Sequence, residues 1–459
     1  MRTVFFLLGL LGPAATLLVP APAGLAPEAW ITAGLGAMMA LWWMTGALPL
    51  AVTALAPLVL APALGLGPLA PVALAYVHPL LFLFVGGFLI GRAVERWGLH
   101  RRIALRILGI AGDHPARLVG GVMGATAFLS LWISNTAAAI VMLPIAASLA
   151  AVRPEGDRLA TALMLGVAYA ATIGGMGSLI GTPPNALFAA YVGRTHDINV
   201  GFAQWAAVGL PVAGVLLAVA WLVLTRLTPG AAGAALPSGG LERPGGWTMA
   251  ERRVATLAAL TASAWIARPF VERAVPLPDF ADAWIAMIGG GVLFLLPSGG
   301  GGRLLDAGGL KGLRWDIIIL FGGGLALAGL IDSSGLAAWI GAGIGRLDGL
   351  PVWVLILALA ATIVYVGELA SNTAMAAVFL PIAGAAALAV GVEPVSFLVP
   401  IALAASVGFM LPVATPPNAI VMKSPAVTRV AMLRAGALLD VIGLVLAVGM
   451  SRLLVGLIV

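Results

Sequence analysis

The sequence contains no cysteine and very few charged residues, which make up only 9% of its 459 positions. Without cysteine the chain can form neither a disulfide framework nor a thiolate metal site. A soluble domain carries roughly 25% charged residues. This chain is 61% hydrophobic with a mean hydropathy of +1.10, so its outer surface must face lipid. The net charge of +6 does not indicate nucleic acid binding, because the arginines lie in short loops between apolar runs.

Long runs of the chain carry no Asp, Glu, Lys or Arg. Such runs extend from Glu28 to Arg92, from Arg117 to Arg153 and from Arg158 to Arg194. Each exceeds the roughly 20 apolar residues that cross a hydrocarbon core, and none alternates in polarity as barrel strands do. We therefore expect an all-α polytopic membrane protein. Residues 1–18 are expected to remain as a first helix, because no cleavage site there precedes a polar mature start.

Two halves of the chain repeat the same motifs in the same order. Ser134-Asn135-Thr136 recurs as Ser371-Asn372-Thr373 at an offset of 237 residues, and the Thr-Pro-Pro-Asn at 182–185 recurs at 415–418. The loop 92–117 has six basic and two acidic residues, whereas its counterpart 332–350 has one basic and two acidic residues. By the positive-inside rule the first loop is cytoplasmic and the second is not. An inverted-topology repeat of this kind is typical of secondary transporters.

The repeat divides the chain into four predicted segments. They are N-terminal scaffold helices at 1–79, a first repeat at 80–227 with a re-entrant hairpin at 116–152 and a broken helix at 160–190, a Pro- and Gly-rich cytoplasmic linker at 228–252, and a second repeat at 253–459 with a hairpin at 352–391 and a broken helix at 395–422.

Each Ser-Asn-Thr motif lies in the middle of an apolar stretch too long for a single spanning helix. Ser, Asn and Thr compete with the backbone inside helices but make good N-caps. We expect each motif to form the tip of a re-entrant hairpin and to open its second helix, whose N-terminus attracts an anion. A pair of polar caps at a helix interface is the alternative. Two copies in matching positions favour the anion site.

Each Thr-Pro-Pro-Asn motif lies near the end of an apolar run. Two successive prolines are expected to break the helix and to free carbonyl groups such as those of Gly181 and Ala414. Broken helices are tolerated at membrane depth where they line a cavity, and free carbonyls with hydroxyls suit Na⁺. A simple proline kink is the alternative, but its duplication favours a cation site.

The distribution of charge predicts how the anion is held. Neither the tips nor the broken helices contain Lys or Arg, and Glu368 lies three residues before Ser371. A dianion in a low-dielectric site needs compensating positive charge. Helix N-termini supply part of it, so co-bound cations must supply the rest. The four histidines lie outside the motifs, which favours Na⁺ over protons.

Taken together, these motifs resemble those of the divalent-anion:sodium symporter (DASS) family of dicarboxylate, citrate and sulfate carriers. The resemblance covers the whole chain and is most specific over ASVGFMLPVATPPNAIV at 405–421. It implies about eleven transmembrane helices plus two re-entrant hairpins, a homodimer in the bacterial inner membrane and elevator-type movement. It further implies Na⁺-coupled symport of divalent anions, C4-dicarboxylates above all, by a protein that is not an enzyme and uses no organic cofactor.

The resemblance also implies roles for individual residues. The expected substrate ligands are Ser134, Asn135, Thr136, Thr182, Pro183, Ser371, Asn372, Thr373, Thr415 and Pro416. A first Na⁺ site is expected at Ser130, Ser134, Asn135 and Gly181, and a second at Gly367, Asn372 and Ala414. Gly367 stands where relatives often carry Thr, so only its backbone carbonyl could serve.

Several alternatives remain open at this point. The cargo could be sulfate, citrate or another oxyanion, and the protein could exchange dicarboxylates. Exchangers of the family carry basic side chains in the pocket, and none is evident here, which favours symport. An anion channel would need no cation sites, and the apolar runs lack the Ser-His pair, acidic pair or zinc motif of an intramembrane enzyme. The expected partners are a small dianion, Na⁺, membrane lipid and a second copy of the chain, not nucleic acid.

Overall fold

A computed structural model describes residues 2–112, 114–151, 158–227, 245–275, 281–345 and 349–458, and every regular element within these ranges is a helix. The N-terminal helices are α1 (Arg2–Leu18), α2 (Pro27–Thr45), α3 (Leu50–Ala54), α4 (Ala56–Ala63), α5 (Leu69–Leu74) and the short 3₁₀ turn η1 (Ala75–Val77). Helices α1 and α2 approach closely at small residues, since a Cβ atom on Gly12 would lie 2.7 Å from the Gly34 carbonyl oxygen. Such contacts are typical of helix pairs in membranes.

Among the described residues each repeat contains seven helices, in matching order. The first has α6 (Pro79–Arg96), α7 (Leu99–Ala111), α8 (Pro115–Ser130), α9 (Asn135–Ala151), α10 (Arg158–Met176), α11 (Pro183–His196) and α12 (Phe202–Leu227). The second has α16 (Trp315–Ser333), α17 (Leu336–Gly345), α18 (Val352–Gly367), α19 (Asn372–Ala389), α20 (Pro394–Ala404), α21 (Pro416–Val421) and α22 (Arg429–Leu454), which the 3₁₀ turn η2 (Val455–Leu457) follows.

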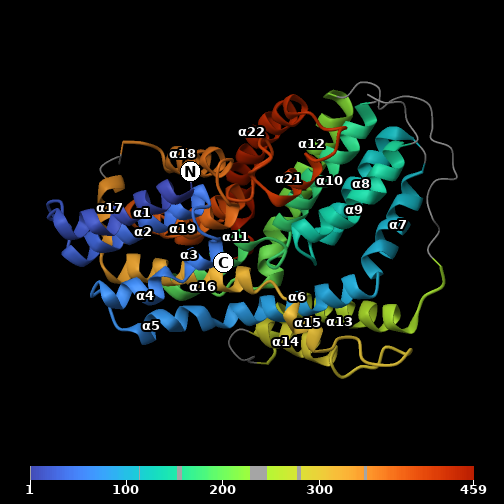
Figure 1. Cartoon of the computed structure of the whole chain (residues 1–459), viewed down its shortest axis with the longest axis horizontal. Coiled ribbons are helices and arrows are strands. Elements are labelled where there is room, and N and C mark those ends of the chain that lie inside the picture. The colour runs from blue at the N-terminus through green and yellow to red at the C-terminus, as the bar shows by residue number, and fades with distance from the viewer. Residues whose placement is uncertain are drawn as a thin grey trace.

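The repeats have opposite directions in space. Helices α6 and α16 run antiparallel (Figure 1), and Phe84 packs on Phe321 between them with ring centroids 5.0 Å apart. The pair α8–α9 and the pair α18–α19 lie at opposite ends of the same view. The predicted inverted repeat is therefore present in the fold.

A third group of helices joins the repeats: α13 (Met249–Glu272), α14 (Ala281–Val292) and α15 (Ala307–Lys311). Residues 228–244 of the predicted linker lie outside the described residues. Thr248 and Glu251 form a capping box that starts α13. Arg102 of α7 contacts Glu251 at 2.9 Å and donates to the carbonyl of Gly245 at 2.7 Å. The start of α13 is thus attached to the first repeat.

Seven helices in the described part of the chain are long and apolar enough to cross a bilayer, and six further apolar helices have 10–17 residues. These shorter helices include one arm of each hairpin, α9 in the first repeat and α18 in the second. The count agrees with the predicted polytopic bundle of spanning helices plus two hairpins.

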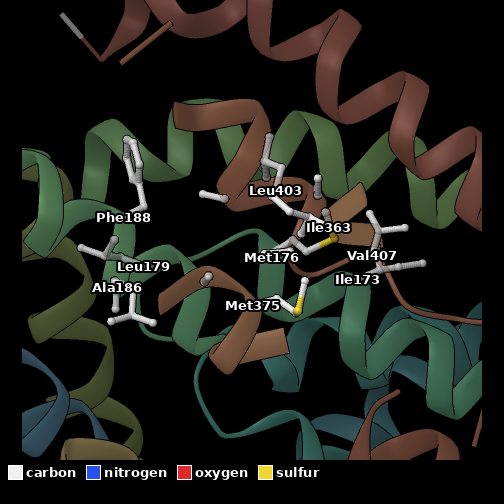
Figure 2. Close-up of a cluster of buried hydrophobic side chains, with 14 of the residues drawn as sticks. Ile173, Met176, Leu179, Ala186, Phe188, Ile363, Met375, Leu403 and Val407 are labelled. Carbon is white, nitrogen blue, oxygen red and sulfur yellow. The ribbon is translucent and has the colours of Figure 1, made fainter. Parts of the chain in front are cut away.

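The core lies where the two repeats meet. Figure 2 shows Ile173 and Met176 of the first repeat beside Ile363, Met375 and Leu403 of the second. All five side chains are buried. Because well-packed interiors resist deformation, this core holds the interrupted helices of both repeats in fixed positions.

Candidate functional site

Both Ser-Asn-Thr motifs lie where a hairpin turns and its second helix begins. Helix α8 ends at Ser130 and α9 begins at Asn135, whereas α18 ends at Gly367 and α19 begins at Asn372. The Ser134 hydroxyl accepts a hydrogen bond from the backbone N–H of Ala137 at 3.3 Å and so caps α9. The other first amides of α9 and those of α19 have no partner within their own helices and can bind an anion.

The helix breaks predicted within 160–190 and 395–422 are present, and each Pro-Pro pair starts the helix that follows its break. Pro183 and Pro416 are the first residues of α11 and α21. Proline is well tolerated there, because the N–H it lacks would have had no helical partner. The interruptions lie just upstream, at residues 177–182 and 405–415.

The asparagines of the two Thr-Pro-Pro-Asn motifs hold these interruptions together in the same way. The Asn185 amide nitrogen donates to the carbonyl oxygens of Gly175 at 3.2 Å and Ser178 at 2.8 Å. The Asn418 nitrogen donates to those of Gly408 at 3.2 Å and Leu411 at 3.0 Å. Gly175 and Ser178 correspond to Gly408 and Leu411 at the same 233-residue offset that separates the two motifs. The sequence contained this signal, but these asparagines were not among the predicted site residues.

The tips and the interruptions of both repeats line one cavity of about 640 Å³. That volume lies within the range of about 300–1,000 Å³ common for small-molecule sites. The cavity wall contains every predicted substrate residue, namely Ser134, Asn135, Thr136, Thr182, Pro183, Ser371, Asn372, Thr373, Thr415 and Pro416. Gly181 and Ala414 also line it, whereas Ser130 and Gly367 lie buried behind the tips.

Oxygen atoms converge beside the first tip. The Asn135 side-chain oxygen faces the Ser130 hydroxyl at 2.7 Å, the Ala171 carbonyl at 3.1 Å and the Gly181 carbonyl at 3.2 Å. With the side-chain amide flipped by half a turn, the Asn135 nitrogen would donate to the same three oxygens. In the orientation with oxygen inward, the four oxygens form the type of ligand set that a hard cation takes.

The second tip differs from the first at one key position. Gly367 is the counterpart of Ser130 at the 237-residue offset, and it offers no hydroxyl. The Asn372 side-chain oxygen is buried without a hydrogen-bond partner. A Cβ atom on Gly408 would lie 3.5 Å from this oxygen and 3.7 Å from a carboxylate oxygen of Glu368. The second cluster is therefore less complete, but it lies close to an acid.

Two buried carboxylates hold the interruption of the second repeat. Glu368 accepts from the backbone N–H groups of Met410 at 2.9 Å and Leu411 at 2.6 Å. Asp440 of α22 accepts from that of Phe409 at 2.9 Å. Neither carboxylate has a basic partner among the described residues, and both side chains are almost completely buried. Negative charge at membrane depth without a counter-ion is costly, so this pair either binds a cation or shares a proton.

A basic side chain does reach the cavity, contrary to the expectation that none would. Arg314, which precedes α16, and Asp316 both line its wall, and they form a two-point ion pair at 3.0 and 2.9 Å. Their side chains are 43% and 56% exposed. The pair has no net charge, so it does not by itself compensate a dianion.

Arg314 also shows towards which side the cavity is accessible. A Cβ atom on nearby Gly312 would lie 2.8 Å from the Arg92 guanidinium. Arg96 pairs with Asp306 at 2.8 Å and holds the pKa of that exposed carboxyl below its usual range. Arg92 and Arg96 open the loop that the positive-inside rule assigns to the cytoplasm. By that assignment, the exposed end of the cavity faces the cytoplasm.

Other cavity residues come from parts of the chain that carry no motif. Trp43, Thr45 and Pro49 reach it from the N-terminal helices, and Phe84 and Phe88 reach it from α6. Their sequence context marks them only as apolar or helix-terminal residues. Sequence reasoning assigned 1–79 to a scaffold and so did not identify this wall.

The paired tips inside an inverted helical repeat define a membrane transporter and not an enzyme. The chain belongs to the DASS family: it matches the family model described as sodium:sulfate symporter transmembrane region over residues 2–457. It is an integral protein of the bacterial inner membrane, as its apolar spanning helices also indicate.

Relatives with curated descriptions are similar over most of their length. The chain is 36% identical over 453 residues to the sodium-dependent dicarboxylate transporter SdcS of Staphylococcus saprophyticus, covering 94% of this chain and 87% of that protein. It is also 36% identical over 434 residues to SdcS of Staphylococcus aureus, covering 89% and 83%.

Solved structures share the fold at low sequence identity. The YdaH transporter of Alcanivorax borkumensis superposes with a TM-score of 0.57 at 16% identity, covering 83% of this chain and 85% of that one. MtrF of Neisseria gonorrhoeae, described with a class of antimetabolite efflux pumps, superposes with a TM-score of 0.60 at 14% identity, covering 98% and 94%. At this identity the likeness concerns the fold alone.

Proposed function

We propose that this protein is a Na⁺-coupled symporter of divalent anions, with C4-dicarboxylates such as succinate, fumarate and malate as its main cargo. The observation that carries the proposal is the single cavity in which both Ser-Asn-Thr tips meet both helix interruptions. The names of the SdcS relatives support Na⁺ and dicarboxylates. Sulfate, citrate or another oxyanion is the second candidate cargo, favoured by the description of the family model.

Electrostatics explains why cations would have to accompany the anion. The N-termini of α9, α11, α19 and α21 begin at cavity residues, and a full helix N-terminus carries a partial charge of about +0.5. Because α21 has only six residues, its dipole is weaker than that of a full helix, and the four partial charges together fall short of the two charges of a dicarboxylate. The Arg314–Asp316 pair adds no net charge. Na⁺ at the two oxygen clusters would supply the remainder without placing a fixed positive charge in the cavity.

The two clusters would bind Na⁺ with different strength. With the Asn135 amide oxygen turned inward, Ser130, Asn135 and Gly181 provide hydroxyl, amide and carbonyl oxygens around one point, with Ser134 at the edge of the same tip. Gly367, Asn372 and Ala414 would provide the second set, in which Asn372 has an oxygen without a partner. Neither cluster calls for an organic cofactor. The nearby charge of Glu368 would partly offset the missing hydroxyl at Gly367.

Transport would proceed by an elevator movement of the tips and interrupted helices past the N-terminal scaffold, in a homodimer embedded in lipid. Exposed apolar side chains on the tips and interrupted helices support such a movement. Leu369 and Val413 line the cavity yet are 61% and 63% exposed. We expect these apolar side chains to be covered by the scaffold when the tips have moved to the other end of their path. Opening of the cavity towards the cytoplasm would correspond to one end of that movement.

Uptake of labelled succinate into proteoliposomes tests the proposal. We expect strong uptake with an inward Na⁺ gradient and only background uptake when K⁺ replaces Na⁺, because an uncompensated dianion is excluded from the site. Equal uptake under both conditions would remove the symport hypothesis and leave the exchanger or the channel.

The same vesicles distinguish the other candidates. An exchanger takes up label only when the lumen holds unlabelled dicarboxylate, whereas a symporter does so from an empty lumen. Competition by sulfate or citrate in preference to succinate would move the cargo assignment to the second candidate.

Substitution of Gly367 by Ser should strengthen the second cation site. The added hydroxyl copies Ser130 of the first repeat, and the new Cβ atom would contact only Met375 at an ordinary 3.6 Å. One hydrogen bond or oxygen ligand is worth about 1 kcal/mol. We therefore expect the half-saturating Na⁺ concentration for succinate uptake to fall about fivefold.

Gly343→Ser provides a matched control for this variant. Gly343 lies in α17, and nothing lies within 4 Å of a Cβ atom built on it. Its half-saturating Na⁺ concentration should stay at the wild-type value. A Gly367→Ser protein that folds normally but needs as much Na⁺ as wild type, or more, contradicts the position given to the second site.

A further inference from the structure

A second cavity of about 350 Å³ lies on the other side of the first hairpin tip. Its walls come from α6, α7, α13 and the end of α8, and are almost entirely apolar. Ile133 of the tip and Trp265 of α13 are among the lining residues. No sequence motif marks this space, and nothing in the proposed transport function uses it.

The cavity is accessible from the lipid-facing surface. Phe128 of α8 lines it and is 42% exposed, and Ala259 of α13 lines it and is also exposed. A ligand could therefore enter from the bilayer without passing through the transport cavity.

Helix α7 places the cavity at the depth of the cytoplasmic leaflet. Leu99 and Ile103 of this helix line the cavity, whereas Arg101 and Arg106 are exposed. A helix with one apolar and one basic face is typical of the membrane interface. Its arginines belong to the loop that the positive-inside rule assigns to the cytoplasm.

Positive charge stands at one end of this apolar space. Trp247 lines the cavity, and its ring lies 4.9 Å from the Arg102 guanidinium and 5.2 Å from that of Arg106. Arg102 already forms an ion pair with Glu251. Arg106 forms no ion pair with any carboxylate in the part of the chain that the structure describes, and its side chain is exposed.

The geometry points to a binding site for an anionic phospholipid of the cytoplasmic leaflet, with an acyl chain in the apolar cavity and the phosphate at Arg106. Apolar walls suit a hydrocarbon chain. Basic groups on the cytoplasmic side of a helix bundle attract anionic headgroups. A neutral lipid would match the walls but not the arginine, and a free anion would match the arginine but not the walls.

The bound lipid would touch elements that also form the transport cavity. Ile180 lines both cavities, and a Cβ atom on Gly91 would lie 3.4 Å from the carbonyl of Trp132 at the tip. An acyl chain in this cavity would pack against both the first hairpin tip and α13. Any effect on transport rate rests on the proposed function, whereas lipid binding does not.

Native mass spectrometry of the full-length protein tests the site directly. Delipidated protein would be titrated with phosphatidylglycerol or with phosphatidylcholine of the same acyl chains. We expect one tightly retained phosphatidylglycerol per chain. Arg106→Gln should lower its retention about fivefold, which is the contribution of one basic group near an anionic headgroup. The neutral lipid should be unaffected by that change.

Variants of α13 separate the cavity from the general surface. Ala259→Phe should fill the cavity and abolish the retained lipid, whereas Ala267→Phe, at an exposed position on the same helix that does not line the cavity, should retain it. Arg252→Gln, also exposed on α13, controls for loss of one charge. Equal retention of both lipids by wild type, or equal loss in both Phe variants, overturns the proposal whether or not the protein transports succinate.

Discussion

Asn135→Ala is expected to reduce Na⁺-driven succinate uptake to background. The substitution removes the side-chain amide around which the Ser130 hydroxyl and two carbonyls converge. It also leaves the first residue of α9 without a polar side chain at the cavity wall. Loss of one hydrogen-bonding group to a charged partner costs about 1.5–3 kcal/mol. A fall of about 100-fold in uptake at limiting Na⁺ is therefore expected.

Ser148→Ala is the matched control for this experiment. Ser148 lies on the same helix, is exposed and donates only to the carbonyl of Ile145. Its uptake should equal that of wild type. Both variants should elute from size-exclusion chromatography like wild type. Near-normal uptake by Asn135→Ala would show that the oxygen cluster is not the cation site.

The outline of the fold was predictable because duplication leaves a pattern that survives in the sequence. Ser134-Asn135-Thr136 and its copy mark equivalent turns at one offset, and the apolar runs limit how the chain can cross the bilayer. The cavity-lining residues were predicted from the same motifs, since helix starts in a membrane need partners for their first amides. Thus all ten predicted substrate residues meet in one cavity.

Residues without a repeated counterpart escaped prediction for a physical reason. Val77 occupies the position that corresponds to Arg314 at the 237-residue offset, so the repeat gives no reason to place Arg314 at the site. It reaches the cavity only because the chain between α15 and α16 packs beside α6. Trp43 and Pro49 likewise depend on how the N-terminal helices pack. Such tertiary contacts leave no local periodicity to detect.

The prolines show how a motif can predict a helix break without revealing what holds it. Two prolines together were expected to break a helix, and the break is present, with Pro183 and Pro184 in the first turn of the helix that follows it. Proline is incompatible only with the helix interior. The loop of the break is also held by Asn185, whose amide donates to a loop carbonyl, and propensity alone could not reveal that bond.

Glu368→Gln is expected to weaken Na⁺ binding at the second site and thereby uptake. Glutamine preserves the shape of the side chain but removes the negative charge near the Asn372 oxygen. Its amide nitrogen also cannot accept from one of the two N–H groups that Glu368 now holds. We expect the half-saturating Na⁺ concentration to rise about tenfold, because loss of a hydrogen bond to a charged group costs about 1.5–3 kcal/mol.

The dependence on Na⁺ distinguishes this effect from simple misfolding. If the lost charge acts on the cation, saturating Na⁺ should restore much of the uptake by Glu368→Gln, because binding and not the folded fraction limits the rate. Misfolded protein would not be rescued in this way. Glu393→Gln is the control: Glu393 precedes α20 at an exposed position and should leave the Na⁺ requirement unchanged. If Glu368→Gln shows wild-type Na⁺ dependence, the buried acid stabilises the interrupted helix alone and the second cation does not depend on its charge.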